Sequence, residues 1–329
     1  MAKSSRMRWK HILPWIVSVG LLLYVFNVAT DWDRLRAATE RAPSLPLFLA
    51  FTIADRIAFF IVWALLQAAA LRRFVAHVPV RSIVAIRGGS ELLRAVSNPL
   101  SDGAFFLGLR ELTGGRLEAV FAAALVPAIC HFLVLALQVT LTLPFLPGSF
   151  DANRDVFIAA GITWVIVLAL AIGARMSTTG SSRIPGAKRV RHWLERFPLR
   201  EIRPFFLGFL AFTVFDVAIQ GLASRAFGVE IAWTALAARI PLLYLALVTP
   251  SLGNFGTREL AWAGLFSEFG SRDALIAYAF AVNSVFLILN VLIGTLFIKR
   301  ALELVGEVRR ARKAGEPAPA PLLRDPAEG

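Results

Sequence analysis

The chain has 329 residues, of which 57% are hydrophobic and only 17% are charged, and its formal net charge is +13. Soluble domains are about half apolar and about a quarter charged, and no polar stretch here is long enough for a soluble domain. Most lysines and arginines lie at the ends of apolar runs, which is the positive-inside pattern of membrane proteins and argues against a nucleic-acid-binding surface. Irregular backbone is not tolerated against lipid, so the sequence predicts an all-α polytopic membrane protein.

Six apolar runs are close to the length of about 20 residues that a helix needs to cross the hydrocarbon core. In chain order these runs are Ile12–Thr30, Leu45–Leu71, Leu117–Leu143, Asp155–Ala174, Pro204–Phe227 and Leu275–Ile298. Basic residues precede the first run, as in a signal peptide, but the run is long and no clear small-residue cleavage site follows it. We therefore expect an uncleaved first helix.

Two further segments do not have the pattern of simple spans. Val80–Leu109 and Ile231–Gly270 each contain an apolar stretch, then a charged break with proline and glycine, then a second short apolar stretch. This pattern indicates a pair of half-helices, or a re-entrant hairpin that enters and leaves the bilayer on one side. The predicted fold is therefore six full spans plus two re-entrant or broken-helix hairpins.

Short sequence matches indicate an internal repeat. FLAFTIAD at Phe48–Asp55 matches FLAFTVFD at Phe209–Asp216 in six of eight positions. Two further matches follow in the same order, Ser97–Phe105 with Val248–Gly256 and Gly114–Val126 with Gly270–Val282. Chance similarity between apolar helices is the alternative, but it does not explain the shared order, spacing and aspartate.

The two repeats extend over residues 45–143 and 204–298. With six spans the first repeat begins outside the cell and the second begins inside, so we expect them to be inverted in the membrane. Inverted repeats with broken helices near the bilayer midplane are typical of secondary transporters, in which one half moves against the other around a central site.

Asp55 and Asp216 lie inside otherwise apolar spans, at matching positions of the two repeats. A charge at the bilayer centre costs about 3 kcal/mol on insertion scales, so intramembrane acids are usually functional or paired. One interpretation is structural, with each acid paired to a nearby arginine. The other is a polar cavity that both halves line.

The hairpins supply the candidate substrate-binding residues. These are Arg258, Glu259, Gly253, Asn254, Gly256, Arg239, Arg87 and Arg94. A partly buried arginine can bind a phosphate bidentately, and glycine turns and half-helix N-termini add N–H donors for an anion. The turn GNFG directly precedes Arg258 and Glu259. The alternative is structural: Arg258 and Glu259 pair with each other and close the hairpin, or they cap a half-helix.

Catalysis has little support from the sequence. We find no nucleophile elbow, no HExxH motif, no P-loop and no Asp-rich pair, and the four histidines are scattered without metal-ligand spacing. We therefore expect a protein that is not an enzyme and that uses no cofactor and no metal ion.

Two motifs resemble the lysylphosphatidylglycerol synthase transmembrane family, whose members are described as having a flippase-like domain. TPSLGNFGTRELAWAGLF resembles the C-terminal signature of that family, and NPLSDGAFFLGLRELTGGRLEAVFAAALV resembles its central segment. The resemblance covers about residues 10–300. The matching positions are Pro250, Gly253, Gly256 and Glu259 in the first motif and Pro99, Gly103 and Arg110 in the second. Where this chain has SDGAF, the family more often has a glycine and an acid before the arginine.

The resemblance implies movement of a lipid or lipid-linked headgroup across the inner membrane. The aminoacyl transferase domain of some relatives has no counterpart here, so lipid aminoacylation is not expected. The implied partners are membrane lipids, either anionic or polyprenyl-phosphate-linked, and enzymes of lipid or glycan synthesis. Two alternatives stay open: a small-anion carrier driven by protons through Asp55 or Asp216, and a non-transporting scaffold of a lipid- or glycan-modifying complex.

Both chain ends are predicted to be cytoplasmic, because basic residues precede the first span and follow the last. Residues 1–300 then form the membrane domain, and residues 301–329 form a cytoplasmic tail that we expect to be disordered. A reporter that is active only in the cytoplasm should therefore be active when it is fused after Arg300. An external position would contradict both the topology and the inversion of the repeats.

Overall fold

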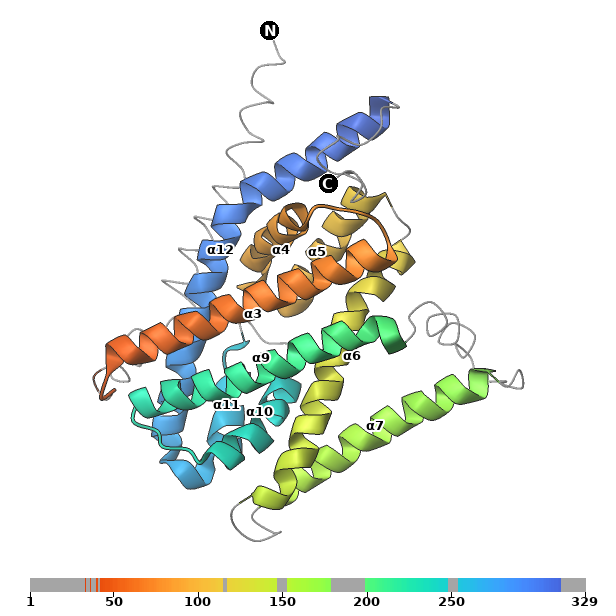
Figure 1. Cartoon of the computed structure of the whole chain (residues 1–329). Helices are drawn as coiled ribbons and strands as arrows, with labels where there is room; N and C mark the ends of the chain where they lie inside the picture. Colours follow the sequence, from red (N-terminus) through yellow and green to blue (C-terminus); the bar gives the residue numbers. More distant parts are fainter. Residues whose placement is uncertain are drawn as a thin grey trace.

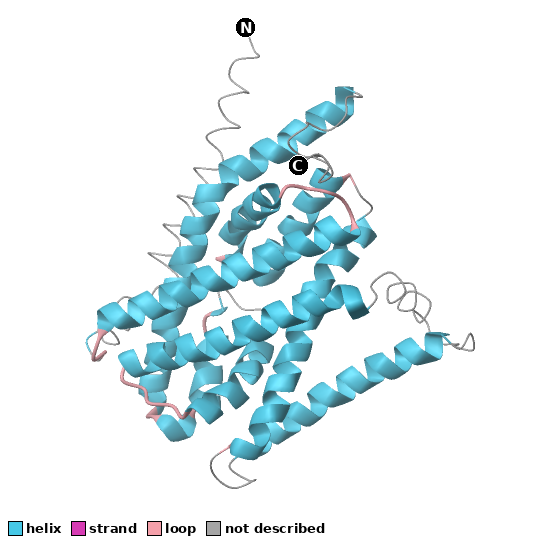
Figure 2. Ribbon diagram, viewed as in Figure 1, coloured by secondary structure: helices cyan, strands magenta, loops and turns pink. Residues whose placement is uncertain are grey.

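The computed structural model describes residues 42–114, 117–146, 153–178, 199–247 and 254–314, together with residues 33, 36 and 40. These residues form helices joined by loops, and no strand occurs among them (Figure 2). The predicted first span Ile12–Thr30, residues 179–198 of the basic loop and residues 315–329 of the tail lie outside the described residues.

Nine α-helices form the described part of the chain. They are α3 Leu45–Phe74, α4 Val80–Arg94, α5 Asn98–Thr113, α6 Leu117–Thr142, α7 Arg154–Thr178, α9 Leu199–Ala226, α10 Trp233–Ala246, α11 Thr257–Leu265 and α12 Arg272–Ala314. Short 3-10 turns at Leu143–Phe145 and Ser267–Phe269 follow α6 and α11.

Four of the described helices, α3, α6, α9 and α12, are long and apolar enough to cross a membrane. The chain is therefore an integral membrane protein of the all-α class. The predicted span Asp155–Ala174 lies within α7, whose apolar part, Val156–Ala169, is shorter. The count of six full spans stays a prediction.

Helix α3 has the side-chain distribution of a helix that faces lipid. Several of its leucines and isoleucines, such as Ile61 and Leu65, are almost half exposed, whereas the polar Asp55, Arg56 and Gln67 are buried. In lipid an apolar side chain can stay on the outside at no cost, while a polar one must be satisfied within the protein. The polar face of α3 is therefore directed into the molecule.

Helices α3 and α9 lie side by side and run in opposite directions (Figure 1). At one end the backbone N–H of Ser44 donates to the carbonyl of Ala226 at 3.0 Å. At the other end Arg73 forms an ion pair with Glu201. The segments Phe48–Asp55 and Phe209–Asp216 lie on these two helices, so the matching sequences are antiparallel in space.

Each broken segment forms two short helices, and the two pairs lie toward opposite ends of α12 (Figure 1). Helices α4 and α5 form the first pair, and α10 and α11 the second. Gly88 of α4 lies against Phe297 in the second half of α12, whereas Trp262 of α11 contacts Tyr278 near its start. The helices α6 and α12, which contain the third pair of matching sequences, run in opposite directions in the same view.

Helix α12 has 43 residues and ends at Ala314. The prediction of disorder from residue 301 onward is therefore wrong for residues 301–314, because Leu304 and Val308 pack into a hydrophobic core. The same extension holds the end of α5, where Arg309 donates to Glu111 at 3.2 Å. The Arg309 guanidinium lowers the pKa of the Glu111 carboxyl.

Close packing between α4 and α12 depends on Gly294, and its loss should be measurable. A Cβ at Gly294 would lie 2.5 Å from the backbone nitrogen of Leu92. We expect Gly294→Ala to destabilise the protein by about 1–3 kcal/mol, as overpacking usually does, measured by thermal unfolding in detergent. Gly306→Ala on the same helix is the control, because its Cβ would meet nothing within 4 Å. Equal stability of the two variants would contradict the close approach.

Candidate functional site

A cavity of about 370 Å³ lies between the two predicted halves, and helices α3, α4, α5, α9, α10, α11 and α12 all contribute to its wall. The charged residues of the wall are Asp55, Arg56, Arg94, Asp102 and Arg258. The sequence interpretation of a polar cavity lined by both halves is consistent with this arrangement, since Asp55 and Arg258 come from different halves.

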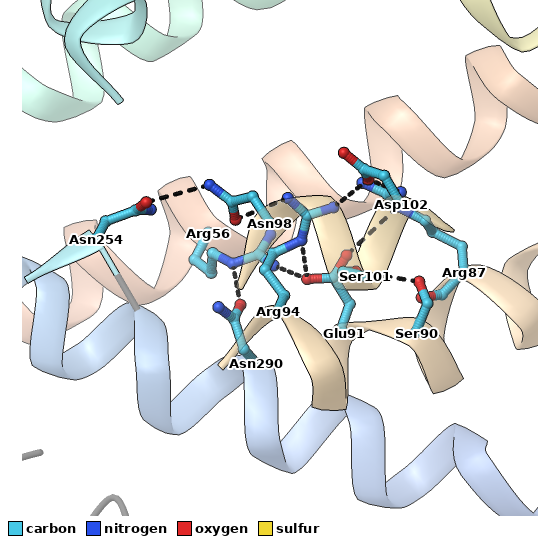
Figure 3. A network of polar contacts seen from close by, with 10 residues as sticks. All are labelled: Arg56, Arg87, Ser90, Glu91, Arg94, Asn98, Ser101, Asp102, Asn254 and Asn290. Carbon is cyan, nitrogen blue, oxygen red and sulfur yellow. Dashed lines mark hydrogen bonds and ion pairs between the residues drawn. The ribbon is translucent and has the colours of Figure 1, made fainter. Parts of the chain in front are cut away.

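Glu91 of α4 is the centre of a charge cluster beside this cavity (Figure 3). Its side chain is 1% exposed, and it forms ion pairs with arginines of its own helix: the Nε atoms of Arg87 and Arg94 lie 3.3 and 2.9 Å from its carboxylate oxygens. Arg56 of α3 forms a third ion pair with it. One carboxylate therefore fixes α3 against α4.

Asp102 of α5 is the second acid of the cluster. Its Oδ1 accepts hydrogen bonds from Arg87 Nη1 and Arg94 Nη2, both at 2.9 Å. Three arginines thus share two carboxylates, which leaves one positive charge in excess. Arg56 also donates from Nε to Asn290 Oδ1 of α12 at 2.6 Å, so the cluster connects four helices.

Arg258 lies on the opposite wall of the cavity, in the first turn of α11. Its side chain is 8% exposed, and its guanidinium stands 5.0 Å over the ring of Phe286. It forms no hydrogen bond and no ion pair with any residue that the structure describes, and its Nε is buried without a partner. Asp55 lines the same cavity and interacts electrostatically with this guanidinium without forming an ion pair. A buried guanidinium without a direct hydrogen-bond partner is costly, so the site is suited to an anionic ligand.

Asp55 and Asp216 meet where α3 and α9 pack together, and their carboxyl groups are within hydrogen-bonding reach of each other. Asp216 also accepts from Gln220 Nε2 at 2.7 Å and from the Tyr244 hydroxyl at 3.1 Å. One oxygen of Asp55 has no partner among the described residues. The matching acids of the two repeats therefore form one buried pair at the edge of the cavity.

The breaks of the two hairpins touch each other in the cavity wall. Asn98, at the start of α5, donates from Nδ2 to Oδ1 of Asn254 at 3.1 Å (Figure 3). Asn254 has a φ of 64°, a left-handed conformation that asparagine adopts more readily than most residues. Because this bond joins segments of different halves, relative movement of the halves would break it.

The predicted binding residues do not all reach the cavity. Arg94, Asn254 and Arg258 line it, and Gly256 caps α11 beside it with a φ of 82°. Glu259 does not line the cavity and makes no ion pair with Arg258 among the described residues. The described residues therefore show no direct ion pair between Arg258 and Glu259 that would close the hairpin.

The other predicted residues have different surroundings. Arg87 lies behind the cavity wall in the Glu91 cluster. Arg239 is held outside the cavity, by the carbonyl of Leu265 at 2.8 Å and by Glu268 at 3.1 Å. Gly253 lies outside the described residues.

Sequence reasoning did not select Glu91, Asn98 or Tyr244 for the site. Each has a weak signal: an acid between two arginines on one helix face, an asparagine directly before a proline, and a tyrosine in an apolar helix. None of these signals identifies a partner, because the partners of Asn98 and Tyr244 lie far away in the sequence.

Within the described residues no group of three or more histidine, cysteine, aspartate and glutamate side chains is arranged to hold a metal ion. The chain matches no family model, no curated protein and no solved structure. The fold class and the site define an all-α integral membrane protein with an arginine-rich internal cavity.

Removal of the Glu91 charge should destabilise the protein strongly. In Glu91→Gln the three arginines would face a single carboxylate, and removal of one partner from a buried ion pair costs about 3–5 kcal/mol. Glu303→Gln is the control, because Glu303 pairs with Arg300 at 3.6 Å on the exposed part of α12, where an ion pair contributes less than about 1 kcal/mol. Chemical unfolding in detergent measures both values, and a similar small loss for both would contradict the central role of Glu91.

Proposed function

We propose that this protein translocates a lipid with an anionic headgroup across the membrane and binds that headgroup at Arg258. The observation that supports this most directly is the unpaired, buried guanidinium of Arg258 at the wall of the cavity. Arginine is the side chain best suited to phosphate, because its planar fork donates two parallel hydrogen bonds.

The surroundings of Arg258 also favour an anion. The Glu91 cluster on the opposite wall has three arginines for two carboxylates, and Arg258 adds a further positive charge. Helix α11 begins at Thr257, so its first turn contributes the positive end of a helix dipole next to the guanidinium. Asp55 lines the same cavity and carries the opposite charge, so the charge that favours an anion is local to Arg258 and the start of α11.

The composition of the cavity wall favours an amphipathic ligand over a purely ionic one. Leu243, Leu247, Phe286 and Leu287 form apolar parts of the same wall. Binding sites for lipids and other amphipathic molecules combine such apolar surface with a few placed polar groups. The antiparallel α3 and α9 and the two opposed helix pairs support translocation, since transporters of this architecture move one half against the other.

A second candidate, a proton-coupled carrier for a small anion, is favoured by the buried Asp55–Asp216 pair. Carboxyl groups inside membrane domains often serve as proton relays in transporters. The third interpretation, a scaffold with a solid core and fully paired charges, is not favoured by a cavity of about 370 Å³ beside the unpaired Arg258.

Arg258→Ala should abolish lipid translocation while it leaves the fold intact. The guanidinium has no polar partner to lose among the described residues, so we expect little change in thermal stability. A charged hydrogen bond to the headgroup is worth about 1.5–3 kcal/mol, so translocation of a fluorescent phosphatidylglycerol in reconstituted liposomes should fall at least about ten-fold.

Arg310→Ala is the matched control for this measurement. Arg310 is an exposed arginine of α12 that, among the described residues, donates to the carbonyl of Gly306 in its own helix. The Arg310→Ala variant should translocate the lipid at the wild-type rate. The binding role of Arg258 is wrong if Arg258→Ala unfolds the protein or transports as fast as the control.

A further inference from the structure

A second cavity of about 270 Å³ lies between α3, α4, α5 and α6. It adjoins the first cavity, because Phe59, Arg94 and Asp102 line both. Its walls are mainly aromatic and small apolar side chains, including Phe106 and Phe121, whose rings pack 5.1 Å apart. Phe59, Arg94 and Asp102 therefore stand between the two cavities, and a ligand that occupies both must pass these three side chains.

The two cavities follow one face of α3. Asp55, Phe59, Trp63 and Gln67 stand four residues apart and so lie along one side of the helix. Asp55 and Phe59 line the first cavity, and Phe59, Trp63 and Gln67 line the second. At a rise of 1.5 Å per residue this face is about 18 Å long, which is enough for a headgroup with two parts.

The second cavity contains two buried polar atoms without partners. The indole Nε1 of Trp63 donates to no described residue, and the amide Oε1 of Gln67 accepts from none. Gln67 is only 4% exposed. Buried polar atoms are almost always hydrogen-bonded, so two unpaired ones beside the same cavity indicate a ligand that supplies the missing bonds.

The unpaired atoms define the chemistry of that ligand. Trp63 offers a donor and Gln67 offers an acceptor, and a hydroxyl group can serve both because it donates and accepts. Two of the charged residues of this cavity, Arg87 and Arg94, both donate to the third, Asp102, so each charged side chain there already has a partner. An acyl chain would leave Trp63 and Gln67 unpaired.

We propose that the second cavity is a subsite for an uncharged, hydroxyl-bearing group attached to the anion at Arg258. The substrate would then be an anionic lipid whose headgroup includes a polyol, either a glycerol or a cyclic, sugar-like polyol. This inference rests on the proposed function, because the anion at Arg258 places the attached polyol next to Phe59. It adds a selectivity for hydroxyl groups that Arg258 alone does not provide.

The test compares three short-chain lipids that bind to the purified full-length protein in detergent, measured by calorimetry. Dihexanoyl phosphatidylglycerol contains a glycerol headgroup, dihexanoyl phosphatidylinositol contains a cyclic polyol, and dihexanoyl phosphatidic acid contains neither. Trp63→Phe removes only the N–H donor, and Gln67→Leu removes the acceptor. Trp164→Phe is the matched control, because Trp164 of α7 donates to Thr140 away from both cavities.

We expect Trp63→Phe and Gln67→Leu each to lower the affinity for one or both hydroxyl-bearing lipids about five-fold, the value of one neutral hydrogen bond. Affinity for phosphatidic acid should not change, and Trp164→Phe should bind all three lipids as the wild type does. The lipid that loses more affinity identifies the preferred polyol.

Equal losses for all three lipids, or no loss in either variant, would overturn the subsite. Failure of the proposed function has a different signature. If Arg258→Ala binds all three lipids as tightly as the wild type, the anion site is wrong, whatever the two cavity variants do. If the wild-type protein binds none of the lipids, both proposals are overturned.

Discussion

The cost of a charge inside the membrane governs the arrangement of this protein. Glu91 forms ion pairs with Arg56, Arg87 and Arg94 and so offsets the cost of burying all three charges. Because Arg56 lies on α3, the same ion pairs join α3 to α4. Asp102 adds α5 to the same cluster, and Asn290 adds α12. Removal of one partner from such a buried group leaves the others uncompensated, so the packing of these helices and the electrostatics of the cavity cannot change independently.

Interrupted helices allow polar residues to meet at the centre of the molecule. The breaks after α4 and before α11 bring Asn98 and Asn254 into contact, and they place Arg258 at the start of a short helix. Non-helical backbone at membrane depth is tolerated only where it is buried in protein or lines a cavity. Asn98 and Asn254, which are described residues of the two breaks, line the central cavity and so satisfy that condition.

The cavity has two walls with different chemical properties. The arginines of the first hairpin form ion pairs with Glu91 and Asp102. Arg258 stacks on the ring of Phe286 and forms no ion pair with any described residue. Under the proposed function, this contrast assigns ligand recognition to the second hairpin and structural support to the first, although the sequence proposes arginines of both hairpins as equivalent candidates.

The sequence by itself determined the membrane class, four of the long spans and the two broken segments with their charged residues. It could do so because hydropathy and helix-breaking residues act locally. The repeated motif also predicts that Asp55 and Asp216 occupy matching positions in the two repeats. The tertiary structure alone decided which arginine is free. Arg87, Arg94, Arg239 and Arg258 are the same residue type in similar apolar surroundings, and only the positions of distant partners such as Asp102 and Glu268 separate the paired ones from Arg258.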